Sequence, residues 1–152
     1  MEIKIIVVGN VKEHYYQNKI EEFLKQIQKR CPVRLICIKD ESIPKQAGEA
    51  SMRKVKDTEG EKILEQIVKT DYVVALCIDG KKLSNEKMCM YKEKADRIGK
   101  TSVTYIIGGS LGLSDAVRKR ADEKMSFSDM TFPHQLMRVM LLEVLANTIC
   151  DM

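Results

Sequence analysis

Short apolar runs alternate with helical patterns along the chain. Four runs are rich in Val and Ile and mostly lack polar alternation: residues 3–8, 33–38, 72–78 and 103–107. Such runs suit strands that are covered on both faces, as in a parallel sheet. A fifth, short strand is predicted near residues 125–127. The pattern therefore predicts an α/β fold with a parallel sheet flanked by helices.

Apolar positions at helical spacing fill the segments between these runs. They form three stripes: Tyr16, Ile20, Phe23, Leu24 and Ile27; Ile63, Leu64, Ile67 and Val68; Met88, Tyr91, Ala95 and Ile98. Ser84 is a suitable N-cap for the third helix. Gly60 should cost ~1 kcal/mol relative to Ala inside a helix, and it fits a break in the helix better than a close backbone approach. Residues 39–50 form a loop inside one domain, which we expect to span residues 1–152.

The last segment is apolar on more than one side. Pro133 suits the first turn of a helix, because its missing N–H would have no partner there. Polar residues are rare in the helix that follows, so its apolar surface needs a partner besides its own sheet. A second copy of the chain is the economical choice. We expect a homodimer whose seam includes four residues of this helix: Met137, Met140, Leu141 and Val144.

Charge and composition add few constraints. Lys and Arg number 26 and Asp and Glu 22, a net charge of +4 that permits an acidic partner such as RNA. Basic residues cluster at positions 81–82, 92–100 and 118–124, a credible RNA surface. No run approaches the ~18 apolar residues of a membrane span, and no signal segment is recognisable. The five cysteines form no C-x-x-C pair, so we expect a cytoplasmic protein with reduced thiols and no membrane contact.

A glycine cluster follows the fourth predicted strand. Residues 108–112 read G-G-S-L-G, at the end of a strand where open α/β sheets bind ligands. The spacing is neither G-x-G-x-x-G nor a P-loop. The cluster fits a tight turn before a helix near Ser114 as well as it fits a binding loop.

Motifs for metal binding and for hydrolysis are missing. His14 and His134 have no carboxylate or cysteine at metal-ligand spacing, and no G-x-S-x-G is present. We therefore expect no metal. His14 fits a solvated helix residue. His134 fits a locally bonded first-turn residue somewhat better than a catalytic one.

The stretch SFSDMTFPH, residues 126–134, is highly specific. Together with the opening KIIVVG at residues 4–9, the central Leu76 and IGGS at residues 107–110, it resembles the RlmH family. This family is part of the SPOUT superfamily, and its members methylate N3 of a pseudouridine in helix 69 of 23S rRNA. The resemblance covers residues 1–145.

This resemblance implies a SPOUT-type fold with a C-terminal trefoil knot, a homodimer, and S-adenosylmethionine (SAM) as methyl donor. It also places the SAM contacts by position, on Leu76, Gly108, Phe127, Ser128, Asp129, Met130, Thr131 and Phe132. The catalytic residue is not identified, and His134 is only a weak candidate. The implied partner is 23S rRNA within the ribosome.

The resemblance breaks at the C-terminal end. Residues 146–148 replace the family's Tyr-Arg-Ala segment, and the sequence given ends at Met152 without a Tyr-His-Lys or Tyr-His-Arg tail. We therefore expect weakened methylation. The alternative is an inactive, dimeric SAM-binding module of the same fold. A remoter one is a nucleotide-binding or flavodoxin-like domain, against which the match at residues 126–134 argues.

Overall fold

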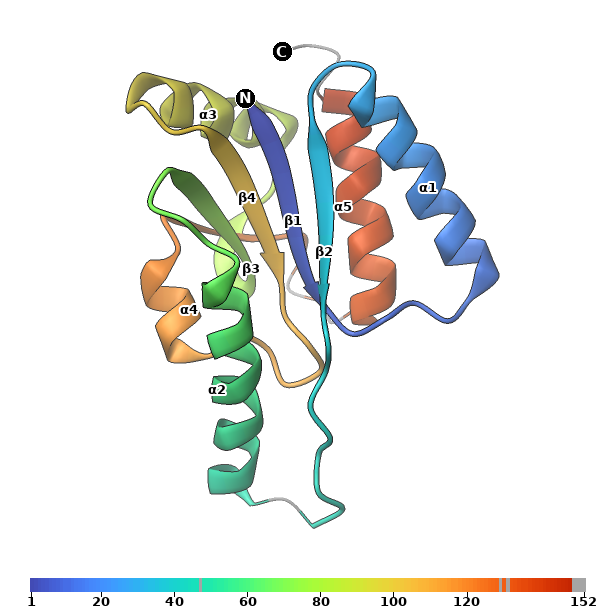
Figure 1. Ribbon diagram of the computed structural model, residues 1–152, viewed down its shortest axis with the longest axis vertical. Coiled ribbons are helices and arrows are strands. Elements are labelled where there is room, and N and C mark those ends of the chain that lie inside the picture. The colour runs from blue at the N-terminus through green and yellow to red at the C-terminus, as the bar shows by residue number, and fades with distance from the viewer. Residues whose placement is uncertain (47, 129, 131, 149–152) are drawn as a thin grey trace.

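The computed structural model describes residues 1–46, 48–128, 130 and 132–148, and of His134 only the backbone. Helices and strands alternate along the chain (Figure 1). Their order is β1 (Glu2–Val8), α1 (His14–Gln28), β2 (Val33–Ile38), α2 (Glu49–Glu65), β3 (Asp71–Lys82), α3 (Asn85–Arg97), β4 (Ser102–Ile107), α4 (Asp115–Arg120), β5 (Glu123–Ser126) and α5 (His134–Thr148).

The five strands form one sheet in the order β2-β1-β4-β3-β5. Every neighbouring pair is parallel, which confirms the predicted parallel sheet. Because β1 and β4 lie inside the sheet with helices on both faces, their Val and Ile side chains are buried on both sides. This explains why the sequence of these strands lacks polar alternation.

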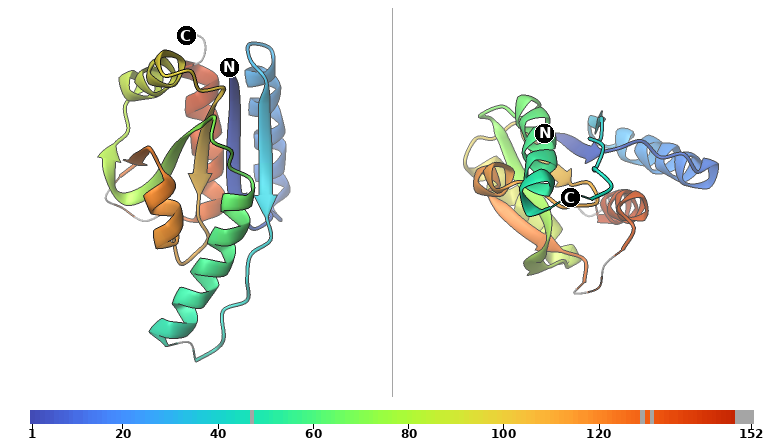
Figure 2. Two further views of the ribbon diagram at one scale, coloured as in Figure 1. Left: turned by 60° about the vertical axis from the view of Figure 1, so that its left-hand side comes forward. Right: turned by 90° about the horizontal axis from the view of Figure 1, so that it is seen from below.

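Helices cover both faces of the sheet. One apolar cluster joins α1, α3 and α5 to the sheet through residues such as Ile27, Tyr91 and Leu142. A second cluster lies on the opposite face and includes Ile63 of α2 and Val117 of α4. Figure 2 shows α2 and α4 on the side of the sheet opposite α1 and α5. The fold is therefore a three-layer α/β/α arrangement.

Helix α5 packs on α1 as well as on the sheet. Leu141, expected at the seam between two copies, is fully buried in the core of a single chain. The prediction that Leu141 lies at the dimer interface was therefore wrong. Helix α1 of the same chain covers part of the apolar surface of α5 that the sequence analysis assigned to a second copy. Met140 stays partly exposed, as does Leu136 one turn before it.

Gly60 does not break its helix, since α2 runs through it without interruption. The prediction of a break was wrong. A Cβ built on Gly60 would overlap the Oγ atom of Ser114, and that same hydroxyl caps α4 by accepting a hydrogen bond from the Val117 N–H at 3.3 Å. Glycine is therefore needed for a close approach of α2 to the start of α4.

Strand β3 is longer than predicted and contains an irregularity. Leu76 and Lys81 both lie opposite Met125 of β5, so the residues between them bulge out of the ladder. A Cβ on Gly80 would lie 2.6 Å from the Met125 nitrogen, so the backbones of β3 and β5 approach each other closely there. Cys77 and Ile78 lie in this bulge.

A buried polar network joins three strands at their amino ends. The Lys4 ammonium of β1 donates to the Asp71 carboxylate of β3 at 2.6 Å and to the Gln66 carbonyl at 2.7 Å. Ser102 of β4 donates to the other Asp71 oxygen at 2.5 Å. Burial opposes the charged carboxylate, but these donors outweigh it and hold the pKa of Asp71 below its ordinary value.

Within the described residues, none of the helices is long and apolar enough to cross a bilayer. Four of the five cysteines can be described, and Cys31, Cys37, Cys77 and Cys89 are free thiols. The residues after Thr148, where the sequence departs furthest from the family pattern, lie outside the described part of the chain.

Candidate cofactor-binding site

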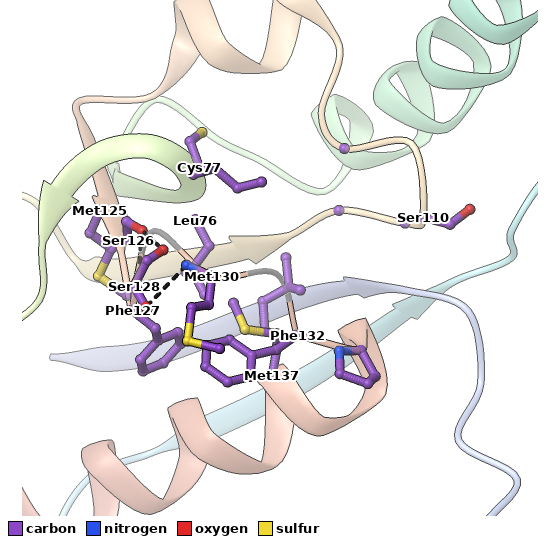
Figure 3. Close-up of a pocket in the computed structure, with 16 residues that line it drawn as sticks. Leu76, Cys77, Ser110, Met125, Ser126, Phe127, Ser128, Met130, Phe132 and Met137 are labelled. Atoms are coloured by element: carbon purple, nitrogen blue, oxygen red, sulfur yellow. Dashed lines mark hydrogen bonds between the residues drawn. The ribbon is translucent and has the colours of Figure 1, made fainter.

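A cavity of about 560 Å3 opens beside the bulge of β3 and the carboxyl end of β4. Its walls come from β3, β5, α5, the glycine turn after β4 and the loop that joins β5 to α5 (Figure 3). The resemblance assigned eight residues to SAM, of which six are described. All six line this one cavity: Leu76, Gly108, Phe127, Ser128, Met130 and Phe132.

The glycine turn is both a tight turn and a wall of this cavity. The Gly112 N–H donates to the Gly109 carbonyl at 3.0 Å, which closes the turn. Helix α4 then begins behind the Ser114 cap. The two interpretations that the sequence left open for this cluster are therefore compatible.

The loop after β5 is held by its own serines. The Ser126 hydroxyl donates to the Ser128 carbonyl at 2.8 Å, and the Ser128 hydroxyl accepts from the Met130 N–H at 3.1 Å. At its start, the Ser126 carbonyl accepts from the Leu83 N–H at 2.8 Å. In Figure 3 the side chains of Phe127 and Phe132 gather on one side of the cavity, near Met130 and Met137.

Three predicted site residues are not placed by the structure. Asp129 and Thr131 lie outside the described residues. Helix α5 begins at His134, next to the cavity residue Pro133, but the His134 side chain also lies outside the described part. The assignment of these three residues stays a prediction.

Several residues of the cavity were missed by sequence reasoning. Met125 and Met137 line it together with Cys77 and Ile78 of the β3 bulge. Met137 falls one helical turn after Pro133, a signal that was available in the sequence. The bulge gave no such signal, because it depends on the register between β3 and β5.

The described lining of the cavity suits ligand binding. Its described side chains are mostly apolar, with serine hydroxyls and backbone amides as the polar groups. Cys77 is the only described lining residue with a titratable side chain, and burial raises the pKa of its thiol, which favours the neutral form. Such a site can hold a flat, partly apolar ligand and read its polar edges through the backbone.

Comparison with known proteins gives a consistent result. A family model described as "Predicted SPOUT methyltransferase" matches residues 1–149. The chain is 48% identical to the ribosomal RNA large subunit methyltransferase H of Clostridioides difficile over 143 residues, which cover 94% of this chain and 90% of that protein. The proteins of the same name from Bacillus pumilus and Listeria monocytogenes are 47% and 46% identical with the same coverage.

Solved structures agree at the level of the fold. A probable methyltransferase from Bordetella pertussis superposes with a TM-score of 0.55 at 12% identity, over 97% of this chain and 93% of its own. The tRNA (m1G37) methyltransferase from Aquifex aeolicus superposes with a TM-score of 0.54 at 15% identity, over 97% and 70%. The parallel sheet, the cavity at its carboxyl edge and the match over nearly the whole sequence lead to one conclusion: this chain belongs to the SPOUT methyltransferase family.

Proposed function

We propose that this protein uses SAM to methylate N3 of a pseudouridine in helix 69 of 23S rRNA, in the large ribosomal subunit. The observation that carries the proposal is the convergence of six residues on one cavity. They come from β3, from the glycine turn and from the loop after β5, and the family resemblance had assigned all of them to SAM. The named relatives, which are ribosomal RNA large subunit methyltransferases, support the RNA substrate.

The residues present fit this methyl donor. A volume of about 560 Å3 lies within the ~300–1,000 Å3 of small-molecule sites. Leu76, Phe127 and Phe132 would wall the adenine ring, and backbone groups of the glycine turn and of the loop would bind the polar parts. When bound, SAM supplies an electrophilic methyl group. The protein's task is then to hold that group in line with the acceptor nitrogen.

The acceptor side of the site is only partly assigned. The imide N3 must lose its proton, which calls for a base or for a favourable electrostatic setting, and the base stays unidentified with His134 as a candidate. Exposed lysines at positions 81, 119 and 124 would contact RNA phosphates. The family's trefoil knot also remains part of the proposal. The alternative of an inactive SAM-binding module is not favoured by the relatives' names.

A methyl-transfer assay tests the proposed function directly. Ribosomes from a strain without this modification are incubated with the protein and labelled SAM, and the modified base is then mapped. We expect label on a single pseudouridine of helix 69. Label on another nucleotide, or none in a protein that binds SAM, would contradict the proposed reaction.

Replacing Phe132 by alanine is expected to weaken SAM binding about tenfold. The substitution removes an aromatic contact worth up to ~1.5 kcal/mol, and ~1.4 kcal/mol corresponds to a tenfold change in Kd. Calorimetry on the folded variant measures this effect. Phe23→Ala is the matched control, since Phe23 of α1 is partly buried against the core and does not line the cavity. Equal SAM affinities in the two variants would remove Phe132 from the site.

The partly exposed apolar residues of α5 support the proposed homodimer. Met140→Glu would place a charge on this strip, so we expect the variant to be monomeric while keeping its helical content. Light scattering and circular dichroism measure the two properties. Glu143→Gln, on the exposed side of the same helix, is expected to remain dimeric. A monomeric wild type at micromolar concentration would refute the dimer.

A further inference from the structure

Arg138 of α5 is the largest fully buried side chain in the described structure, with 1% of its surface exposed. It forms none of the ion pairs found among the described residues. Its Nε–H is buried without a hydrogen-bond partner. The guanidinium thus carries a permanent charge into the interior without a described carboxylate to balance it.

The Arg138 guanidinium is held by main-chain oxygens at the end of β1. One terminal nitrogen donates to the Val8 carbonyl at 3.1 Å and to the Gly9 carbonyl at 3.0 Å. The Gly9 N–H in turn donates to the Ile38 carbonyl of β2 at 2.7 Å. Arg138 therefore ties α5 to the point where the first two strands end.

This arrangement is costly for stability alone. Burial disfavours the charged form and lowers the pKa of Arg138, an effect that the neighbouring Cys37 only partly offsets. An apolar side chain of similar length would avoid the loss of hydration, and such replacements of buried charges are often neutral or stabilising. Stability therefore does not explain the arginine at this position, and the part of the structure that it holds in place is the better explanation.

Arg138 directly follows Met137 near the start of α5. Met137 lines the cavity, as does Pro133, which immediately precedes the helix. We propose that Arg138 is a positioning residue: its hydrogen bonds to the end of β1 fix the start of α5, and with it the cavity wall formed by Phe132, Pro133 and Met137. This role rests on the proposed function, since it concerns the geometry of the SAM site.

Two substitutions and one control test the role. Arg138→Lys keeps the charge but loses the planar fork, and Arg138→Met also removes the charge. We expect the Kd for SAM to rise ~10-fold in Arg138→Lys, and further in Arg138→Met. The matched control is Ser102→Ala, which breaks a buried hydrogen bond at the amino ends of the strands, away from the cavity. It should lower the melting temperature and leave the Kd for SAM unchanged.

Amide hydrogen exchange gives a readout that needs no ligand. The Met137 N–H donates to the Pro133 carbonyl at 3.0 Å. Exchange of this amide and of the next ones along α5 should accelerate in Arg138→Lys and stay unchanged in Ser102→Ala. The positioning role is overturned if Arg138→Lys matches wild type in both SAM affinity and exchange, or if Ser102→Ala weakens SAM binding equally. Should Arg138→Met not fold, Arg138→Lys alone decides the question. A wild type that binds no SAM would instead refute the proposed function, and the exchange experiment would still test the attachment of α5.

Discussion

Replacing Gly80 by valine is expected to destabilise the protein by ~3 kcal/mol or more, at the upper end of overpacking effects. The new Cβ would lie 2.6 Å from the Met125 nitrogen and 2.7 Å from the Lys124 carbonyl carbon. Both are backbone atoms of β5, so no side chain can rotate away to make room. Strand β5 would therefore have to move away from β3 at this position.

Urea unfolding followed by circular dichroism measures the effect of Gly80→Val. Gly48→Ser is the control, because a Cβ at Gly48 meets no atom within 4 Å and serine suits the N-cap position of α2 at least as well as glycine. It should not lower the unfolding midpoint. Because Gly80 belongs to the same bulge as the cavity residues Cys77 and Ile78, SAM affinity should fall in any Gly80→Val protein that folds. A midpoint equal to wild type would show that β5 adapts to the added side chain.

The second large effect is expected near the amino ends of β1 and β3. Lys4→Met should cost ~3–5 kcal/mol, because it leaves the buried Asp71 carboxylate without its cation. The double variant Lys4→Met with Asp71→Leu should recover part of this loss, since neither charge then remains buried. Additive losses in the double variant would show that the ion pair is not the source of the effect.

The same network predicts a pH dependence. Because the folded pKa of Asp71 is lowered, its contribution is fully present above the unfolded pKa of ~3.9 and is lost as pH falls through the folded value. Wild-type stability should therefore decline below about pH 4, and the double variant should show less of this decline. Urea midpoints measured across this range provide the test.

Local signals predicted much of the fold correctly. The strand at residues 33–38 and the Ser84 cap depend on nearby residues only, and both agree with the structure. Features that depend on distant partners could not be found in this way. Gly60 resembles a helix break until α4 is seen to pack against it, and the β3 bulge is set by its register with β5.

The candidate site shows the same difference between residues found by local sequence signals and residues whose role depends on distant contacts. Residues placed by a specific sequence match, such as Phe127 and Phe132, line one cavity, and their contact with SAM stays a prediction. Leu141 was assigned to the wrong surface, because an apolar helix does not reveal by its periodicity which side a neighbouring helix covers. The role proposed for Arg138 could not be predicted from the sequence, since it depends on the burial of the side chain.

The strand order has a consequence for how the chain must be made. Strand β1 sits between β2 and β4, with Glu2 opposite Ser102. A ribosome adds roughly 5–20 residues per second, so one edge of the apolar strand β1 waits several seconds for its partner while β2 is already available. Pairings this distant in sequence also slow refolding of the finished chain. Strand β1, which is synthesised first, thus becomes fully paired only after β4 has been synthesised.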